Sequence, residues 1–340
     1  MTLRIASRRG FILIFALWVL VLLTVLVAGI AAGVRQKIIF VHKLDERGRM
    51  HYTLLAGLSQ TEAYLRQQLA NVTDAYTVEV KTSLHNNPAV FARVPLGADE
   101  AGVGFTLYDG VFAVERFGVV DEERKLNINR ANYLALQRLL QRVLGARAEE
   151  AGHLAHSIID WRQMGESEET GFFSDEYYPN LQYPYPKKSA PYEVPDELLL
   201  VKGVTKEVYE RLLAYVTIYG SGQVNINTVP GEVLYALGLD DDVIEKILAV
   251  RRGKDGIEGT EDDHVFLKPY DVASEVNAEA KLDPAQVRAI DGLNLQGLVT
   301  TYSRYFSFNV RGSLAGGFWS KTARGVFCPS ENKLLYWREK

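Results

Sequence analysis

The sequence predicts an α+β protein: a long N-terminal helix, an antiparallel sheet, and a large all-α domain inserted between strands of that sheet. Three observations lead to this prediction. An uncharged apolar run over residues 11–34 continues into a helical pattern. Apolar and polar residues begin to alternate near Tyr76 and again from Tyr302, as they do in half-buried strands. Between these regions, Leu-Asn-Ile-Asn at 126–129 recurs as Val-Asn-Ile-Asn at 224–227.

The apolar run, FILIFALWVLVLLTVLVAGIAAGV at residues 11–34, is expected to span a membrane. A helix rises 1.5 Å per residue, so the run is long enough to cross a hydrocarbon core of roughly 30 Å. A cleaved secretory signal would have a shorter apolar region, of about 7–15 residues, and a small-x-small cleavage site. A buried helix of a globular protein would carry some polar positions. We therefore expect one membrane-spanning helix.

The helix is expected to continue through residues 35–71. Leucines recur there at spacings of three and four residues or their multiples, which places them on one helix face, and charged residues occupy the other faces. The first half of the helix should therefore contact lipid or other subunits, and the second half should lie on the protein's own sheet. The leucines are Leu54, Leu58, Leu65 and Leu69.

The sheet is expected from alternating segments on both sides of the insert. Asp109-Gly110 supplies the positive φ values of a two-residue hairpin turn. The Asn, Pro and Gly residues within 81–104 predict a loop there. The expected strands are residues 76–80, 105–108, 111–114, 117–120, 302–310, 317–327 and 333–338.

The insert is expected to be helical. Each Asn-Ile-Asn segment precedes a helical stretch, 131–143 in the first copy and 230–237 in the second, and another helix is expected over 206–216. The second copy, VNINTVPGEVLYALGLDDDVIEKILAVRR, is similar to a helix-hairpin-helix unit. An Asn before a helix accepts hydrogen bonds from the free N–H groups of the first turn, so we expect the repeated Asn residues to cap these helices. The predicted insert is thus an all-α domain of helix-hairpin-helix or SAM-like type.

Composition excludes several classes of protein. The chain has 340 residues, 47% of them hydrophobic, which is sufficient for ordinary packed cores. Its net charge of −4 does not favour a surface that neutralises phosphates. Cys328 is the single cysteine, so neither a disulfide framework nor a cysteine zinc site can form, and its role is not indicated. The six histidines form no metal motif, and no phosphate loop or dinucleotide fingerprint is present. We expect no enzymatic activity.

Two acidic stretches are candidate cation sites. GESEETGFFSDEYY follows a predicted helix at residues 165–178, and KDGIEGTEDDH at residues 254–264 interleaves carboxylates with glycines. Calcium takes six to eight oxygen ligands on a loop that can wrap around it. Neither stretch has the spacing of an EF-hand, so solvated acidic loops remain the alternative. The candidate ligands are Asp160, Asp175, Glu176, Asp255, Glu258, Asp262 and Asp263.

The N-terminal segment MTLRIASRRG is basic, lacks acidic residues and ends at Gly10, immediately before the apolar run. It resembles a type IV prepilin leader. The resemblance implies that a prepilin peptidase cleaves after Gly10 and that the new N-terminal residue, Phe11, is methylated. The fifth mature residue is then Phe15, where most members of this superfamily carry a Glu. This departure is typical of the large K component of type II secretion.

The leader, Phe15, the two Asn-Ile-Asn segments and the ending LLYWRE occur in one order that resembles the general secretion pathway protein K family over essentially the whole chain. The resemblance implies a minor pseudopilin at the tip of the type II secretion pseudopilus, assembled with the I and J minor pseudopilins. It also implies one pass through the inner membrane, C-terminal domains in the periplasm, and structural calcium in the inserted domain. The implied divisions are a leader at 1–10, a membrane helix at 11–34, pilin-like parts at 35–125 and 296–340, and the insert at 126–295.

Two other functions remain open. A minor pilin of a type IV pilus would share the leader and the sheet, but such pilins usually lack a helical insert of this size. A membrane-anchored DNA receptor would use the helix-hairpin-helix units to bind phosphates. The hairpin at Gly238 is followed by Asp240, Asp241 and Asp242, whose carboxylates would repel phosphate. We therefore expect no nucleic-acid partner.

Overall fold

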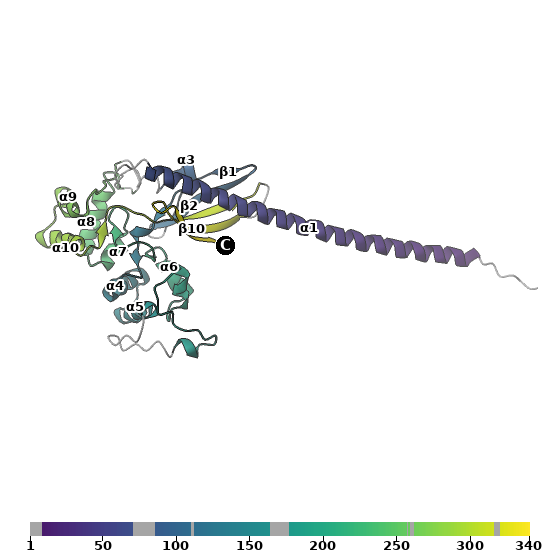
Figure 1. Ribbon diagram of the computed structural model, residues 1–340, viewed down its shortest axis with the longest axis horizontal. Coiled ribbons are helices and arrows are strands. Elements are labelled where there is room, and N and C mark those ends of the chain that lie inside the picture. The colour runs from purple at the N-terminus through teal and green to yellow at the C-terminus, as the bar shows by residue number, and fades with distance from the viewer. Residues whose placement is uncertain are drawn as a thin grey trace, which may run out of the picture.

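In the computed structural model, helix α1 (Arg9–Ala70) forms a long arm whose C-terminal part lies over the sheet (Figure 1). The structure describes residues 9–70, 86–109, 112–163, 177–256, 258, 262–315 and 320–340. Within this part of the chain, α1 is the one helix long and apolar enough to cross a membrane, and its most apolar window is fully exposed.

The two halves of α1 have different surroundings. Residues 11–46 are exposed, whereas Met50, Leu54, Leu58 and Leu65 are buried against the sheet. The prediction that the second half lies on the protein's own sheet is confirmed, and contact of the first half with lipid or other subunits stays a prediction. The side chain of Leu69 lies outside the described residues.

The sheet is antiparallel, with strand order β1-β2-β9-β10-β11; β3 also pairs with β2, and β4 with β9. The predicted hairpin around Asp109-Gly110 corresponds to β2 and β3, with Leu107 opposite Val114. The bounds are β1 Val94–Leu96, β2 Asp99–Asp109, β3 Phe112–Arg116, β4 Val120–Asp121, β9 Phe306–Ser313, β10 Ser320–Cys328 and β11 Lys333–Glu339.

The loop predicted over residues 81–104 is wrong from residue 88 onward. This part holds helix α3 (Pro88–Phe91), strand β1 and the start of β2. Glycine is required at 102 and 104 of β2 because another backbone segment passes too close for a side chain. A Cβ at Gly102 would lie 3.1 Å from the carbonyl oxygen of Ala92. Pro95 is tolerated because β1 is an edge strand. The expected strand at 76–80 lies outside the described residues.

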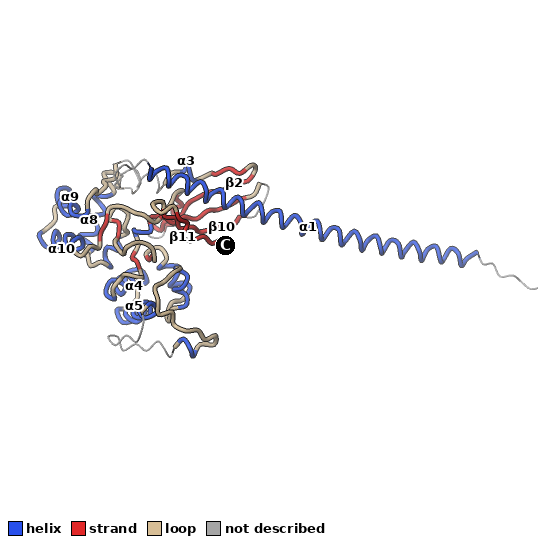
Figure 2. Tube along the Cα trace, viewed as in Figure 1, coloured by secondary structure: helices blue, strands red, loops and turns tan. Residues whose placement is uncertain are grey.

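The insert occupies the chain between β4 and β9, and Figure 2 shows its helices gathered away from the strands of the main sheet. The α+β prediction is confirmed, but the insert is not all-α as predicted, because it also contains two parallel pairs of short strands. The helix expected over 206–216 ends at Leu212, because residues 216–217 form a strand. The elements are η1 Glu122–Arg124, β5 Leu126–Asn127, α4 Tyr133–Leu144, α5 Ala148–Arg162, η2 Tyr178–Asn180, η3 Pro195–Leu200, α6 Lys206–Leu212, β6 Val216–Thr217, β7 Val224–Asn225, α7 Gly231–Ala236, α8 Asp241–Arg251, η4 Pro269–Asp271, α9 Val272–Ala280, α10 Pro284–Leu295 and β8 Val299–Thr300.

The insert consists of two similar units, which we call repeat 1 (residues 126–217) and repeat 2 (residues 224–300). Each unit begins with a short strand that enters the Asn-Ile-Asn segment, continues through helices, and ends with a second short strand parallel to the first. These parallel pairs are β5 with β6 in repeat 1 and β7 with β8 in repeat 2. The two repeats share one hydrophobic core, and α1 and the sheet form a second core. The insert is therefore a packed body of its own, attached to the sheet at its two ends.

Candidate functional site

The repeated Asn residues fix the start of each repeat. Asn127 Oδ1 accepts the backbone N–H of Asn129 at 2.8 Å, and Asn225 Oδ1 accepts that of Asn227 at 3.0 Å. These are local turns, so the prediction that the repeated residues cap the following helices is wrong. Helix α4 is capped instead by Asn132, whose side chain accepts from Ala135 N.

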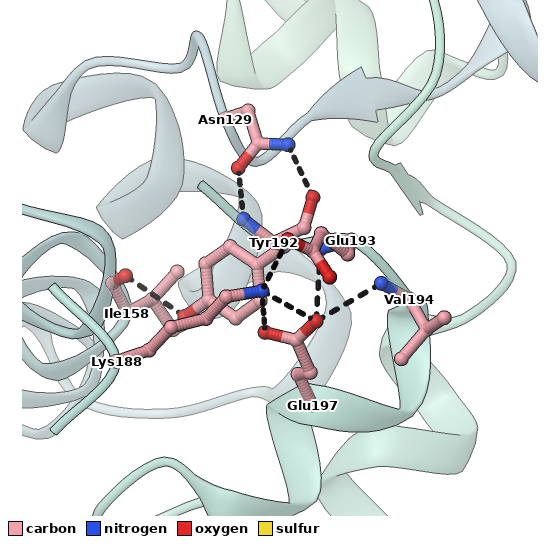
Figure 3. A network of polar contacts seen from close by, with 7 residues as sticks. All are labelled: Asn129, Ile158, Lys188, Tyr192, Glu193, Val194 and Glu197. Atoms are coloured by element: carbon pink, nitrogen blue, oxygen red, sulfur yellow. Dashed lines mark hydrogen bonds and ion pairs between the residues drawn. The ribbon is translucent and has the colours of Figure 1, made fainter. Parts of the chain in front are cut away.

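The second Asn of each copy binds a distant backbone segment. Asn129 donates to the carbonyl of Tyr192 at 3.0 Å and accepts its N–H at 2.8 Å (Figure 3). Asn227 makes the same pair of bonds with Phe266, at 2.9 and 2.8 Å. Each amide side chain thus pairs with a backbone as a neighbouring strand would. Tyr192 and Phe266 occupy corresponding places in the two repeats, three residues before Pro195 and Pro269.

One arginine in each repeat donates hydrogen bonds to backbone carbonyls of the turn at the Asn-Ile-Asn segment. Arg162 donates to the carbonyl oxygens of Ile128 and Ala131. Arg251 donates to those of Ile226 and Val229. Burial of the Arg251 guanidinium lowers its pKa, and an ion pair with Glu258 at 3.0 Å opposes that effect. The four carbonyls are therefore satisfied without water, which a buried turn requires.

The first candidate cation site is only partly described. Asp160 lies on α5, is buried, and its Oδ1 is 3.1 Å from the ammonium group of Lys187. Asp175 and Glu176 lie outside the described residues. The described part of this site is thus a buried ion pair, in which a cation already balances the carboxylate.

The second candidate site lies in the turn after α8. Asp262 Oδ2 accepts the backbone N–H groups of Lys254 at 2.7 Å and Asp255 at 3.1 Å. Glu258 is bound to Arg251. Among the described residues, no group of three or more His, Cys, Asp or Glu side chains is gathered around one point. The donors are of the oxygen type that calcium takes, but Asp262 and Glu258 would have to exchange their present partners to bind it.

The helix-hairpin-helix turn between α7 and α8 is acidic and already paired. Asp241 forms an ion pair with Arg142 at 2.7 Å, and Asp242 forms one with Lys246 at 2.9 Å. The basic residues that a phosphate would require are here used to neutralise carboxylates. This arrangement does not favour nucleic-acid binding.

The insert is attached to the sheet by three consecutive carboxylic acids, Asp121, Glu122 and Glu123, which we call the acidic triplet. Asp121 Oδ2 accepts from Asn225 at 3.0 Å and from Thr228 at 2.6 Å, so it holds repeat 2. Burial raises the pKa of Asp121, and its hydrogen bonds oppose the rise.

The other two members of the acidic triplet, Glu122 and Glu123, bind repeat 1 and the segment that leads into β9. Glu122 accepts from Thr217 of repeat 1 at 2.6 Å and pairs with Lys125 at 2.5 Å. Burial alone would raise the pKa of Glu122, but Lys125 and Arg324 outweigh it and hold that pKa below its usual value. Glu123 accepts the backbone N–H of Arg304, just before β9. The sequence analysis missed this cluster; its signal is the run Asp-Glu-Glu-Arg-Lys at residues 121–125, directly before the first Asn-Ile-Asn segment.

A second contact joins repeat 1 to the last strand. Asp196 of η3 accepts from Tyr336 at 3.0 Å and from Arg338 at 2.8 Å, both on β11. Burial would raise the pKa of Asp196, but these bonds and one from Tyr209 hold it below its usual value. The insert therefore meets the sheet at two separate places and has a defined position on it.

An apolar N-terminal helix lying on an antiparallel sheet defines a pilin-like subunit, and the large helical insert distinguishes this chain within that class. Residues 115–221 match the family model "Type II secretion system (T2SS), protein K". The match covers the start of the insert and agrees with the family resemblance seen in the sequence.

The fold is shared with a solved structure. A chain in the crystal structure of the GspK-GspI-GspJ complex from the enterotoxigenic Escherichia coli Type 2 Secretion System matches with a TM-score of 0.62 and 16% identity. The match covers 88% of this chain and 99% of that one. No curated protein matches the chain. The structural match thus shows a shared fold over most of this chain.

Proposed function

We propose that this chain is the minor pseudopilin at the tip of a type II secretion pseudopilus, acting by protein–protein assembly and without catalysis in the export of folded proteins. The observation that carries the proposal is the combination of a pilin-like helix and sheet with a packed insert between β4 and β9. The match to the protein K family model and the fold shared with a chain of the GspK-GspI-GspJ complex support it.

The membrane end of the proposal rests on α1. The helix has a fully exposed apolar window near the N-terminus. Contact of these apolar side chains with water would be strongly unfavourable, whereas lipid solvates them and the helix satisfies its own backbone hydrogen bonds. We propose one pass through the inner membrane, with the sheet and the insert in the periplasm. Cleavage by the prepilin peptidase after Gly10 and methylation of Phe11 would precede assembly.

Placement at the tip follows from two features. Mature position five is Phe15, which cannot pair with the N-terminal amine of a neighbouring subunit, and an unpaired charge in a packed helical core costs several kcal/mol. The insert stands to one side of the α1 and sheet unit (Figure 1), so it would obstruct a subunit stacked above it. A subunit at the end of the filament meets neither difficulty.

Partners are proposed to bind the stretch of α1 between the membrane and the sheet. Ile38, Ile39, Phe40, Val41 and Leu44 are all about half exposed or more. Exposed apolar side chains of this number on one helix indicate a surface that is covered in an assembly. By analogy with the solved complex, the partners would be the I and J minor pseudopilins of the same secretion system.

Co-purification tests the proposal. Full-length chain carrying Phe40→Asp should lose its minor-pseudopilin partners and fail to support secretion, since a charge would be buried in the contact. Tyr183→Asp, on the insert at 79% exposure, is the matched control and should retain both. Retention of the partners by Phe40→Asp, or loss by both variants alike, would contradict the proposed surface.

A further inference from the structure

Glu123 lies where three parts of the chain meet: the start of the insert, the loop between the two repeats, and the segment that returns to β9. Its Oε2 accepts the backbone N–H groups of Arg304 at 2.5 Å and Tyr305 at 3.4 Å. A Cβ placed on Gly220 would lie 3.0 Å from Glu123 Cγ, so the side chain also packs directly on the loop between the repeats. The Glu123 side chain therefore contacts both the loop between the repeats and the segment that returns to β9.

The charges around Glu123 do not neutralise it fully. Within the acidic triplet, Asp121 places a like charge near Glu123. The charge of Glu122 is balanced by ion pairs with Lys125 and Arg324. From the returning segment come Arg304, Tyr302 and Tyr305. The Arg304 guanidinium donates to the Tyr302 hydroxyl at 3.4 Å and makes no ion pair with Glu123 among the described residues. The loop between the repeats contributes Gly220, Ser221 and Gln223, none of which is charged.

A polar cavity adjoins this carboxyl group. Its volume is about 240 Å³, and its lining consists of Glu123, Gly220, Ser221, Gln223, Thr300, Tyr302, Arg304 and Tyr305. The same loop contains two glycines in the left-handed region, Gly220 at φ 85° and Gly222 at φ 100°, which fix its tight path. The cavity is already partly open to solvent, whereas Glu123 itself is buried, so a small displacement of the loop would bring water to the carboxyl group.

We propose that Glu123 makes the attachment of the insert to the sheet dependent on proton concentration. The protonated, neutral carboxyl group is retained in the closed junction, whereas the ionised group favours displacement of the loop between the repeats, which hydrates the charge. The insert would thus be held firmly in acid and more loosely at neutral pH and above.

The sign follows from linkage. Burial, reinforced by the charge of Asp121, raises the pKa of Glu123 to about 7 from an ordinary value of 4.5. Between these two values, opening the junction releases one proton. The opening equilibrium constant therefore rises about tenfold per pH unit over this range and becomes constant above pH 7.

Hydrogen exchange of the full-length chain in detergent micelles tests the proposal. Exchange rates are corrected for intrinsic chemistry at each pH from 5 to 8, and peptides covering residues 217–223 and 300–306 are compared with those of helix α4. In the wild-type chain the opening of these two segments should increase by one to two orders of magnitude between pH 5 and pH 7, while α4 remains unchanged.

Two variants test whether Glu123 causes the pH-dependent increase in exchange. Glu123→Gln has a neutral side chain of the same shape at every pH, and should show a flat profile. Glu115→Gln, at a half-exposed carboxylate of β3, is the matched control and should follow the wild type. A flat wild-type profile, an undiminished rise in Glu123→Gln, or a rise that disappears only in Asp121→Asn would overturn the proposal.

Discussion

The contact between α1 and the sheet predicts the effect of replacing one glycine. A Cβ on Gly57 would lie 2.4 Å from Val310 Cγ1 and 3.3 Å from Ala101 Cβ, so the helix would have to move outward by about 1 Å. Alanine gains about 1 kcal/mol of helix propensity, but overpacking a core costs about 1–3 kcal/mol. We expect Gly57→Ala to destabilise the folded part by up to about 2 kcal/mol.

Gly48 provides the matched control on the same helix. A Cβ there meets nothing within 4 Å, so Gly48→Ala should gain the propensity term alone and stabilise the protein by about 0.5–1 kcal/mol. The two variants have the same chemistry and differ only in whether β9 lies against the glycine. Opposite signs of the change in free energy of unfolding are therefore expected.

A double variant isolates the contact. Val310→Ala removes the obstructing methyl groups, and with Gly57→Ala it should lose less stability than the sum of the two single changes, by at least about 1 kcal/mol. The assay is near-UV circular dichroism of the full-length chain in micelles, where 1 kcal/mol corresponds to roughly 2–4 °C in melting temperature. Equal shifts for Gly57→Ala and Gly48→Ala, or strict additivity with Val310→Ala, would refute the packing described for α1.

Three further predictions concern processing, metal and the repeats. Mass spectrometry should find a mature N-terminus at methylated Phe11, and Gly10→Leu should remain uncut; retention of Met1 in the wild type, or a cut near Ala31, would contradict the leader. If the acidic turns bind calcium, millimolar calcium should raise the melting temperature above that in chelator, because a ligand of the folded state stabilises it; equal temperatures would favour solvated loops. Asn227→Ala should destabilise the insert by about 1–3 kcal/mol, because the buried backbone groups of Phe266 lose their partner. The control is Arg130→Ala, at an exposed position next to Asn129, which should change the stability by less than about 0.5 kcal/mol.

Much of the architecture could be predicted because it depends on local pattern. The leucine spacing of 54, 58 and 65 identified the face of α1 that is buried, and Asp109-Gly110 located the β2–β3 hairpin. The repeated Asn-Ile-Asn segments marked the start of each unit of the insert. In each case the signal lies within a few residues of the feature that it predicts.

The rest depends on contacts between distant residues. Asn129 pairs with Tyr192 and Asn227 with Phe266, across 63 and 39 residues of sequence, and no local pattern distinguishes such pairing from helix capping. The glycines of β2 suggested a loop, because the backbone that crosses Gly102 is visible only in three dimensions. The acidic triplet has the composition of an exposed turn, and its burial follows from the meeting of both repeats with the sheet.

The position of the protein in the filament is the most direct test of the proposed function. Immunogold labelling of assembled pseudopili with an antibody against the insert should show a label at one end of each filament and none along its length. This result follows from Phe15 at mature position five and from the bulk of the insert between β4 and β9. Labels distributed along the fibre, or filaments formed by this chain alone, would contradict the proposed role as a tip subunit.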